Sequence, residues 1–378
     1  MMNHADVAVI GGGIVGLAHA WEAARRGLSV VLFERGEKAE MASIRNFGMV
    51  WPIGQPPGER YEAAMRSRAK WLELRDAAGL WVNECGAVHA VYEPDELAVI
   101  ADFAGAAPKL GIACELVEPA AALRRFPALN PDRLLGVLHS PTELCVDPRQ
   151  AMATIPKFLA EQFPNVTLRF GTTVTGIAMP TVRTASGETW QVGRAVVCGG
   201  ADFETLFPDV YAASGMTRCK LQMMATGPQP GGWRLGPHLA GGLTLAHYKS
   251  FEVAGSLAKL KARIAAQYPE YVKYGIHVMA SQNHLGEVVI GDSHEYDAER
   301  SIFDKAEIDE LILKYLRTLV KLPDWTIVRR WHGVYAKHPT RAQFTAEPQP
   351  NCHVVGSPGG AGMTLAFGLA ETFWNDVR

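Results

Sequence analysis

A glycine-rich turn between an apolar strand and a helical pattern constrains this chain more than any other feature. The strand runs directly into Gly11, Gly13 and Gly16, which have the spacing G-x-G-x-x-G. The first glycine of such a turn permits a tight bend, the second lets backbone approach a pyrophosphate, and the third lets the helix pack on the strand. The helix begins at Ile14 and Val15, and its unpaired N–H groups favour a phosphate. The pattern predicts a dinucleotide-binding site, with an ordinary turn as the alternative.

The residues after the turn agree with this prediction. The helical pattern ends at Gly27, and a second apolar strand over residues 29–33 leads into Glu34 and Arg35. An acidic side chain at this point accepts hydrogen bonds from both ribose hydroxyls. Because a carboxylate disfavours a 2′-phosphate, we expect a dinucleotide other than NADP.

Composition and charge exclude several classes of protein. With 378 residues, 48% hydrophobic and 20% charged, the chain has room for two domains or for one large domain with an insertion. A net charge of −2 argues against a nucleic-acid-binding protein that relies on bulk charge. The apolar stretch near the N-terminus is too short and too interrupted to span a membrane, so we expect no membrane partner.

The six cysteines are scattered along the chain. They form no C-x-x-C pair and no spacing typical of a metal site. We therefore expect reduced thiols, a cytoplasmic protein and no bound metal.

The order of the predicted elements indicates an α/β fold. A βαβ unit opens the chain, and a helix that begins at Asp147 and Pro148 leads into short β-branched strands. Longer strands dominate from residue 215 to 335, and a strand, a glycine-rich turn and a helix close the chain. The simplest partition is a cofactor domain of residues 1–80, 145–205 and 336–378 and a substrate domain of residues 81–144 and 206–335.

The helix predicted over residues 305–321 has the strongest pattern in the chain. Its apolar residues recur at helical spacing, and Asp304 with Glu307 resembles a capping box. Since an apolar stripe of this kind usually packs in a core, we expect a structural role for this helix.

Further motifs follow the first one in order. They are residues 43–49 (SIRNFGM), Asp147-Pro148, Val174, residues 198–201 (CGGA) and the closing turn at residues 359–362. Together with Glu34, this order resembles the FAD-dependent D-amino acid oxidase family, which includes glycine and sarcosine oxidases. The resemblance covers nearly the whole chain. It implies a Rossmann-type, glutathione-reductase-like FAD-binding domain with an inserted α+β substrate domain built on an antiparallel sheet.

The resemblance also implies which residues hold the cofactor. Val174 would meet the adenine end through its backbone, and Ser43, Arg45 and Asn46 would line the pyrophosphate and the flavin edge. Gly48 and Met49 would lie close to the flavin ring. The closing turn precedes a helix whose N-terminus favours the negative charge that gathers on a reduced flavin. The remaining cofactor residues expected are Gly199, Gly200, Gly359, Gly360, Ala361, Gly362, Met363 and Thr364.

Two positions depart from the family pattern. Tyr335 stands where glycine oxidase and D-amino acid oxidase have an arginine that grips the substrate carboxylate. Gly333 stands where monomeric sarcosine oxidases attach the flavin through a cysteine. We therefore expect a non-covalent FAD and a substrate other than a standard α-amino acid.

The candidate catalytic residues lie in two segments. Alternation along the strand places Tyr335 and Lys337 on the face of Gly333, with His332 on the other face as a further candidate. His247 and Lys249 lie in a second segment that is rich in cationic and aromatic residues. Each has a structural alternative: the tyrosine packs in the core, the lysines are solvated, and the histidines make ordinary hydrogen bonds.

These features predict an FAD-dependent oxidase of a small amine. A hydride would pass to flavin N5, and the imine would hydrolyse to a carbonyl compound and an amine. The blocks at residues 45–51 and 200–203 resemble a branch of the family associated with aminoalkylphosphonate breakdown. An N-methylated 2-aminoethylphosphonate is therefore the expected substrate, with molecular oxygen as electron acceptor and the oligomeric state left open. Alternatives are a glycine, sarcosine or D-amino acid oxidase, an FAD-binding protein without turnover and a flavin hydroxylase.

Overall fold

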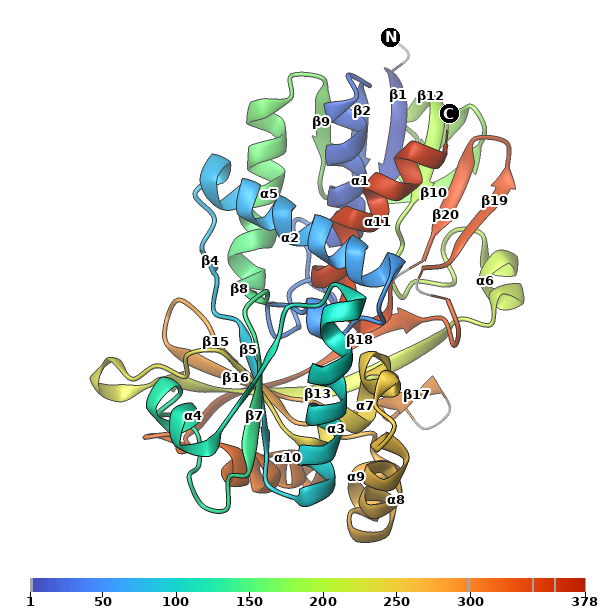
Figure 1. Ribbon diagram of the computed structural model, residues 1–378. Coiled ribbons are helices and arrows are strands. Elements are labelled where there is room, and N and C mark those ends of the chain that lie inside the picture. Colours follow the sequence, from blue (N-terminus) through green and yellow to red (C-terminus); the bar gives the residue numbers. More distant parts are fainter. Residues whose placement is uncertain (1–2, 298–299, 342, 357, 378) are drawn as a thin grey trace.

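The computed structural model describes residues 3–297, 300–341, 343–356 and 358–377. Two β-sheets with their helices lie one above the other in Figure 1, and both ends of the chain lie at the edge of the upper layer. This is the α/β arrangement with two different sheets that the sequence predicts.

The upper sheet has a parallel centre. Strand β1 (Asn3–Ile10) pairs in parallel with β2 (Val30–Phe33) on one side and with β12 (Thr189–Val197) on the other. Strand β9 (Val166–Arg169) extends the sheet beyond β2, and β20 (Cys352–Val355) extends it beyond β12. All four residues of β2 are buried, as expected for a parallel strand covered on both faces.

Antiparallel strands and three helices complete this layer. The added strands are β10 (Val174–Ala178), β11 (Thr181–Thr184) and β19 (Thr345–Gln349). The helices are α1 (Ile14–Arg25), α5 (Pro148–Gln162) and α11 (Gly362–Asp376). Trp21 of α1 is buried and meets Phe367 of α11 edge to face, with ring centroids 5.3 Å apart.

The lower sheet is almost entirely antiparallel. Its strands are β5 (Ala87–Val91), β6 (Glu115–Val117), β7 (Gly136–Ser140), β13 (Thr217–Pro228), β14 (His238–Ala240), β15 (Met279–Gln282), β16 (Glu287–Gly291), β17 (Glu295–Tyr296) and β18 (Ile327–Lys337). The pair β5–β14 is parallel and departs from the predicted antiparallel sheet. The long pair β13–β18 sets Tyr335 opposite Cys219 and Gly333 opposite Leu221.

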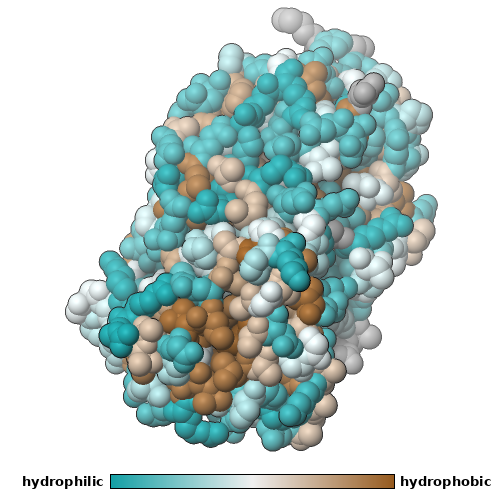
Figure 2. Space-filling view, in the orientation of Figure 1, coloured by the Kyte–Doolittle hydropathy of each residue, from teal (hydrophilic) through white to brown (hydrophobic). Residues whose placement is uncertain are grey.

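Helices surround the lower sheet and its edges (Figure 1). They are α3 (Pro94–Ala106), α4 (Pro119–Arg125), α7 (Gly242–His247), α8 (Leu257–Gln267), α9 (Pro269–Lys273) and α10 (Ala306–Leu319). Helix α6 (Pro208–Ser214) comes after β12 of the upper sheet along the chain. Figure 2 shows a mostly hydrophilic face with one hydrophobic patch, which lies over the region of α4 and β7.

A small sheet and one long helix connect the layers. Strand β8 (Leu144–Val146) pairs with β3 (Met49–Val50) and β4 (Val82–Asn83). Helix α2 (Glu59–Ala78) packs tightly on α11. The contact is so close that a Cβ at Gly368 would lie 2.0 Å from the carbonyl oxygen of Ala63. The Ser67 hydroxyl accepts a hydrogen bond from the Gly368 N–H at 2.8 Å, so this helix crossing is closely fixed.

The predicted capping box of α10 is wrong. The helix begins at Ala306 after Lys305, and no side chain caps it. The Asp304 carboxylate instead contacts the Lys220 ammonium and the His332 ring, each at 2.9 Å. The Lys220 ammonium and the His332 ring nitrogen from the neighbouring sheet therefore compete successfully with the backbone N–H groups of the helix for this carboxylate.

Candidate active site

Three adjoining cavities lie where the two layers meet. The dinucleotide cavity, of about 470 Å³, is lined by the ends of the upper strands. The junction cavity, of about 110 Å³, is lined by the glycine-rich turns and by β18. The distal cavity, of about 250 Å³, is lined by the lower layer and by residues from segments 46–60, 338–341 and 358–364. Tyr335 lines all three.

The first glycine-rich turn has no room for side chains. A Cβ at Gly11 would lie 2.3 Å from the carbonyl oxygen of Cys198, and one at Gly16 would lie 1.8 Å from the carbonyl oxygen of Gly11. A Cβ at Gly13 would lie 3.0 Å from the Ser43 hydroxyl. The glycines at positions 11 and 16 therefore let the turn pack closely on α1 and on the segment that follows β12.

Two side chains fix the polar edge of this turn. The Glu34 carboxylate accepts hydrogen bonds from the Gly12 N–H at 2.7 Å and the Gly36 N–H at 2.9 Å. The Ser43 hydroxyl accepts one from the Ile14 N–H at 3.0 Å. The carboxylate is thereby held on the wall of the dinucleotide cavity.

The far end of the dinucleotide cavity combines predicted and unpredicted residues. Val174, Gly199 and Gly200 line it as predicted. Arg35, which was also predicted, lines it, and its guanidinium pairs with Asp202 at 2.7 Å. Ile10 lines the cavity as well but was not predicted. Sequence reasoning missed Tyr211, whose ring stacks on Phe203 at a centroid distance of 4.8 Å. The Tyr211 hydroxyl is buried and makes no hydrogen bond to the described residues.

The junction cavity collects several of the predicted cofactor residues. Ile14, Val15, Arg45, Asn46, Gly359, Gly360, Gly362 and Met363 line it. The Arg45 guanidinium donates to the carbonyl of His332 at 3.3 Å, which ties this segment to β18. A Cβ at Gly333 would lie 3.1 Å from the Arg45 carbonyl oxygen, so this position favours glycine.

Several predicted cofactor residues lie beside the junction cavity rather than in it. Gly48 faces β8, because its Cβ would lie 1.9 Å from the carbonyl oxygen of Val146. Met49, Ala361 and Thr364 line the distal cavity. The Thr364 hydroxyl accepts a hydrogen bond from the Trp51 N–H at 2.9 Å.

The distal cavity brings together four of the five predicted catalytic residues. Tyr335, Lys337, His247 and Lys249 line it. The first two come from β18, His247 ends α7, and Lys249 begins the short helical turn that follows. The His332 side chain is not in the cavity wall, because its ring turns to the other face of β18 and contacts Asp304.

Positive charge dominates the distal cavity. Its cationic residues are Arg60, Lys249, Lys337 and Arg341, and its acidic residue is Asp292. Burial lowers the pKa of Lys337, and the neighbouring Lys249 and Arg60 lower it further. Burial also raises the pKa of the Asp292 carboxyl and that of the Tyr335 hydroxyl well above their usual values. The cavity therefore favours anions.

Several lining residues escaped the sequence reasoning. Arg60 lies on α2, His277 precedes β15, and Asp292 and His294 follow β16. Their positions in the sequence form no motif, and separate connections bring them together. The one signal in the sequence that could have identified them was the position of polar residues next to predicted strand ends.

A comparison with protein families decides the identity. The FAD dependent oxidoreductase family, DAO, matches residues 6–373. This chain belongs to that family. The FAD-dependent oxidoreductase has the cradle that its cofactor requires: closely packed glycines at the turn and an acidic side chain at the second strand end.

Individual relatives are distant. The oxidoreductase is 32% identical over 143 residues to one subunit of the anaerobic glycerol-3-phosphate dehydrogenase of Escherichia coli K12, which is 38% of this chain and 26% of that protein. The match thus spans about a quarter of the relative's length. Its fold is similar to glycine oxidase from Geobacillus kaustophilus, with a TM-score of 0.77 at 18% identity over 100% of this chain and 95% of that chain. It is also similar to L-proline dehydrogenase from P. horikoshii, with a TM-score of 0.75 at 21% identity over 98% and 92%.

A helix that crosses a membrane must be both long and apolar. Within the described residues of the oxidoreductase, no helix meets both requirements.

Proposed function

We propose that this oxidoreductase oxidises a small amine that carries an anionic tail, such as an N-methylated 2-aminoethylphosphonate. The observation that carries the proposal is the charge of the distal cavity, where four cationic residues accompany a single carboxyl group among the described residues. That cavity adjoins the junction cavity through Tyr335, Gly359 and Gly360. An amine placed between them would have its tail among cations and its reacting carbon toward the glycine-rich turn.

The chain's own residues bind and orient the substrate. A bound FAD would supply the acceptor for a hydride from the carbon that carries the nitrogen, and the imine would hydrolyse to a carbonyl compound and an amine. Lys249, Lys337 and Arg60 hold the anionic tail through charge-assisted hydrogen bonds. Tyr335, which is buried and neutral, packs between the cavities and keeps water from the reacting atoms.

A doubly charged tail fits the cavity better than a carboxylate. A buried dianion is very costly unless several donors converge on it, and this cavity presents several. The resemblance of residues 45–51 to the aminoalkylphosphonate branch agrees with this choice. A single arginine would suffice for a carboxylate, and the strand position for that arginine holds Tyr335.

Oxidation of glycine, sarcosine or a D-amino acid is the second candidate. The similarity of fold to glycine oxidase over the whole chain favours it. The tyrosine at position 335 weighs against it.

Three further expectations belong to this proposal. FAD is held without a covalent bond, since Gly333 offers no side chain for attachment. Molecular oxygen is the electron acceptor. A reducing cytoplasm is the proposed location, because all six cysteines are described and none forms a disulfide. The division into a cofactor domain and a substrate domain also stays a proposal, and β18 crosses its boundary at residue 336.

The test compares three amines of equal length under anaerobic conditions. N-methyl-2-aminoethylphosphonate, its carboxylate homologue and an N-methylated alkylamine without an acid group are each added to the yellow holoprotein. Faster bleaching of the flavin by the phosphonate than by the carboxylate supports the proposal. Preference for the carboxylate favours the second candidate, and bleaching by none of the three would contradict amine oxidation.

Single-residue variants test whether Lys249 binds the anionic tail of the substrate. Lys249→Gln should raise the KM for the phosphonate by about tenfold or more, as expected for loss of a charged hydrogen bond of ~1.5–3 kcal/mol. Lys259→Gln, on the exposed side of α8, is the matched control. Peroxide release after admission of air tests oxygen as the acceptor.

A further inference from the structure

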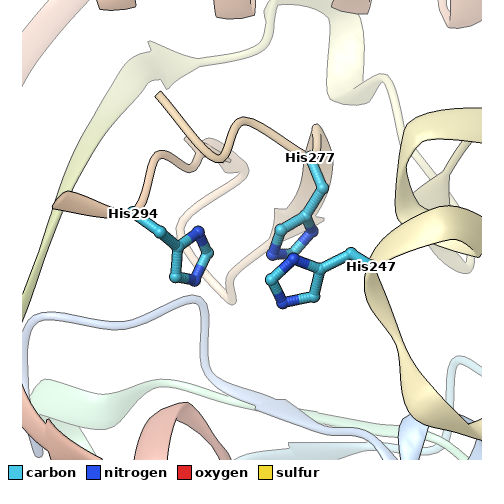
Figure 3. Close-up of side chains that lie close together, drawn as sticks. All are labelled: His247, His277 and His294. Carbon is cyan, nitrogen blue, oxygen red and sulfur yellow. The ribbon is translucent and has the colours of Figure 1, made fainter. Parts of the chain in front are cut away.

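Three histidines from separate segments meet in the distal cavity. His247 ends α7, His277 precedes β15, and His294 follows β16. Figure 3 shows the rings of His247 and His277 next to each other, with the ring of His294 to one side. One ring nitrogen from each can be chosen so that all three lie within 4.8 Å of one another.

The three candidate ligands are imidazoles, and His277 and His294 are buried whereas His247 is exposed. A neutral imidazole keeps a lone pair on one nitrogen, which is the form that binds metals.

The hydrogen bond of His294 fixes which nitrogen keeps its lone pair. Its Nδ1 lies 2.9 Å from the carbonyl oxygen of Gly275, which can only accept, so Nδ1 carries the proton. Nε2 is then an acceptor and cannot donate to an anion. A metal-binding histidine commonly has such a backbone carbonyl behind its protonated nitrogen.

A buried carboxyl group accompanies the second histidine. Asp292 Oδ1 lies 3.3 Å from Nε2 of His277. Neither this oxygen nor Nδ1 of His277 makes a hydrogen bond to the described residues, although both are buried. Carboxyl groups of this kind orient metal-bound imidazoles.

We propose that His247, His277 and His294 bind one divalent transition metal, with zinc as the first candidate. Imidazole suits zinc, and three histidines leave a fourth position open to the cavity. Metal–nitrogen distances of about 2.0–2.1 Å require ligand nitrogens about 3.4 Å apart in a tetrahedral site. The rings of His247 and His277, now stacked with centroids 3.7 Å apart, must therefore rotate toward His294.

The surrounding charge predicts the fourth ligand. The Lys337 ammonium faces the three histidines and repels a cation bound there. An anion in the fourth coordination position would attract both the metal ion and the ammonium group. We expect methylphosphonate to strengthen zinc binding. Because zinc and methylphosphonate can both be added without any amine, the result is independent of the proposed oxidation.

The experiment measures zinc binding to chelator-treated holoprotein by calorimetry and by metal content after dialysis. Wild type should bind one zinc per chain. Asp292→Asn removes an outer-shell partner and should weaken zinc binding by about 10–100-fold. His247→Gln and His277→Gln each remove a ligand and should weaken zinc binding by more than about 100-fold. Flavin absorbance shows that each variant is folded.

His338→Gln is the matched control, because His338 lines the same cavity but accepts hydrogen bonds from the Thr340 and Arg341 N–H groups through Nδ1. Its zinc affinity should equal that of wild type. Absence of saturable binding by wild type overturns the proposal, as does binding that His247→Gln and His277→Gln leave unchanged. Bleaching by amines in a protein that binds no zinc would leave the proposed function standing and remove only the metal site.

Discussion

Gly11 and Gly16 are in direct contact across the first turn: a Cβ at Gly16 would lie 1.8 Å from the Gly11 carbonyl oxygen. This contact sets the separation of β1 and α1. It also sets where the first N–H groups of the helix point, and therefore how a pyrophosphate can approach.

Gly16→Ala should remove the cofactor and destabilise the protein. The added methyl must push α1 away from β1, and overpacking of this kind costs about 1–3 kcal/mol. Urea unfolding and the ratio of flavin to protein absorbance measure the two effects. Gly105→Ala is the control, since a Cβ there meets nothing within 4 Å in α3 and should stabilise by about 0.5–1 kcal/mol. A yellow Gly16→Ala protein of normal stability would contradict the prediction.

Glu34→Gln should weaken FAD binding by about 10–100-fold. The carboxylate is held by two backbone N–H groups, and hydrogen bonds to a charged group contribute ~1.5–3 kcal/mol. The fluorescence of flavin released on dilution gives the dissociation constant. Glu40→Gln, which lines the same cavity but is exposed, should bind FAD as wild type does. Equal affinities of the two variants for FAD would show that the Glu34 carboxylate does not contribute to FAD binding.

Lys337 should make anion binding sensitive to alkaline pH. Burial lowers its pKa from the usual 10.5, so the ammonium loses its charge at a lower pH than an exposed lysine does. The dissociation constant of methylphosphonate, which carries no amine, should therefore rise as pH increases toward 10.5. In Lys337→Arg the rise should move to higher pH, because arginine stays charged. The perturbation of the flavin spectrum reports the binding, and identical profiles for both proteins would contradict the assignment.

Glu287 should contribute to stability above its folded pKa. Although burial raises the pKa, hydrogen bonds from Arg329 and Asn283 lower it more, to about 2. A depressed carboxyl pKa gives stability that is complete above the unfolded value of about 4.5 and is lost as pH falls toward 2. After allowance for the part-exposed arginine, we expect a loss of about 1–2 kcal/mol over this interval.

Acid titration of the unfolding free energy checks this prediction. Glu287→Gln should show a shallower fall between pH 4.5 and 2 than wild type. The exposed Glu161→Gln should follow wild type. Parallel curves for wild type and Glu287→Gln would show that the ion pair contributes nothing.

Local patterns predicted the first βαβ unit correctly. The glycine turn, Glu34 and the helix from Ile14 depend on contacts within one βαβ unit, so spacing along the chain is enough to identify them. Alternation along a single strand likewise placed Tyr335 and Lys337 on one wall, and both line the distal cavity. The same reasoning failed at Asp304, where a neighbouring strand supplied better partners than the helix end.

The amino-acid sequence by itself determined the dinucleotide cradle and the α/β class, because periodicity and backbone sterics act between near neighbours. The tertiary structure alone decided the distal cavity. Arg60, His277, Asp292 and His294 are brought to it by α2 and by the ends of β15 and β16. The physical reason is that these side chains meet only when two layers pack together, and no spacing along the chain records that contact.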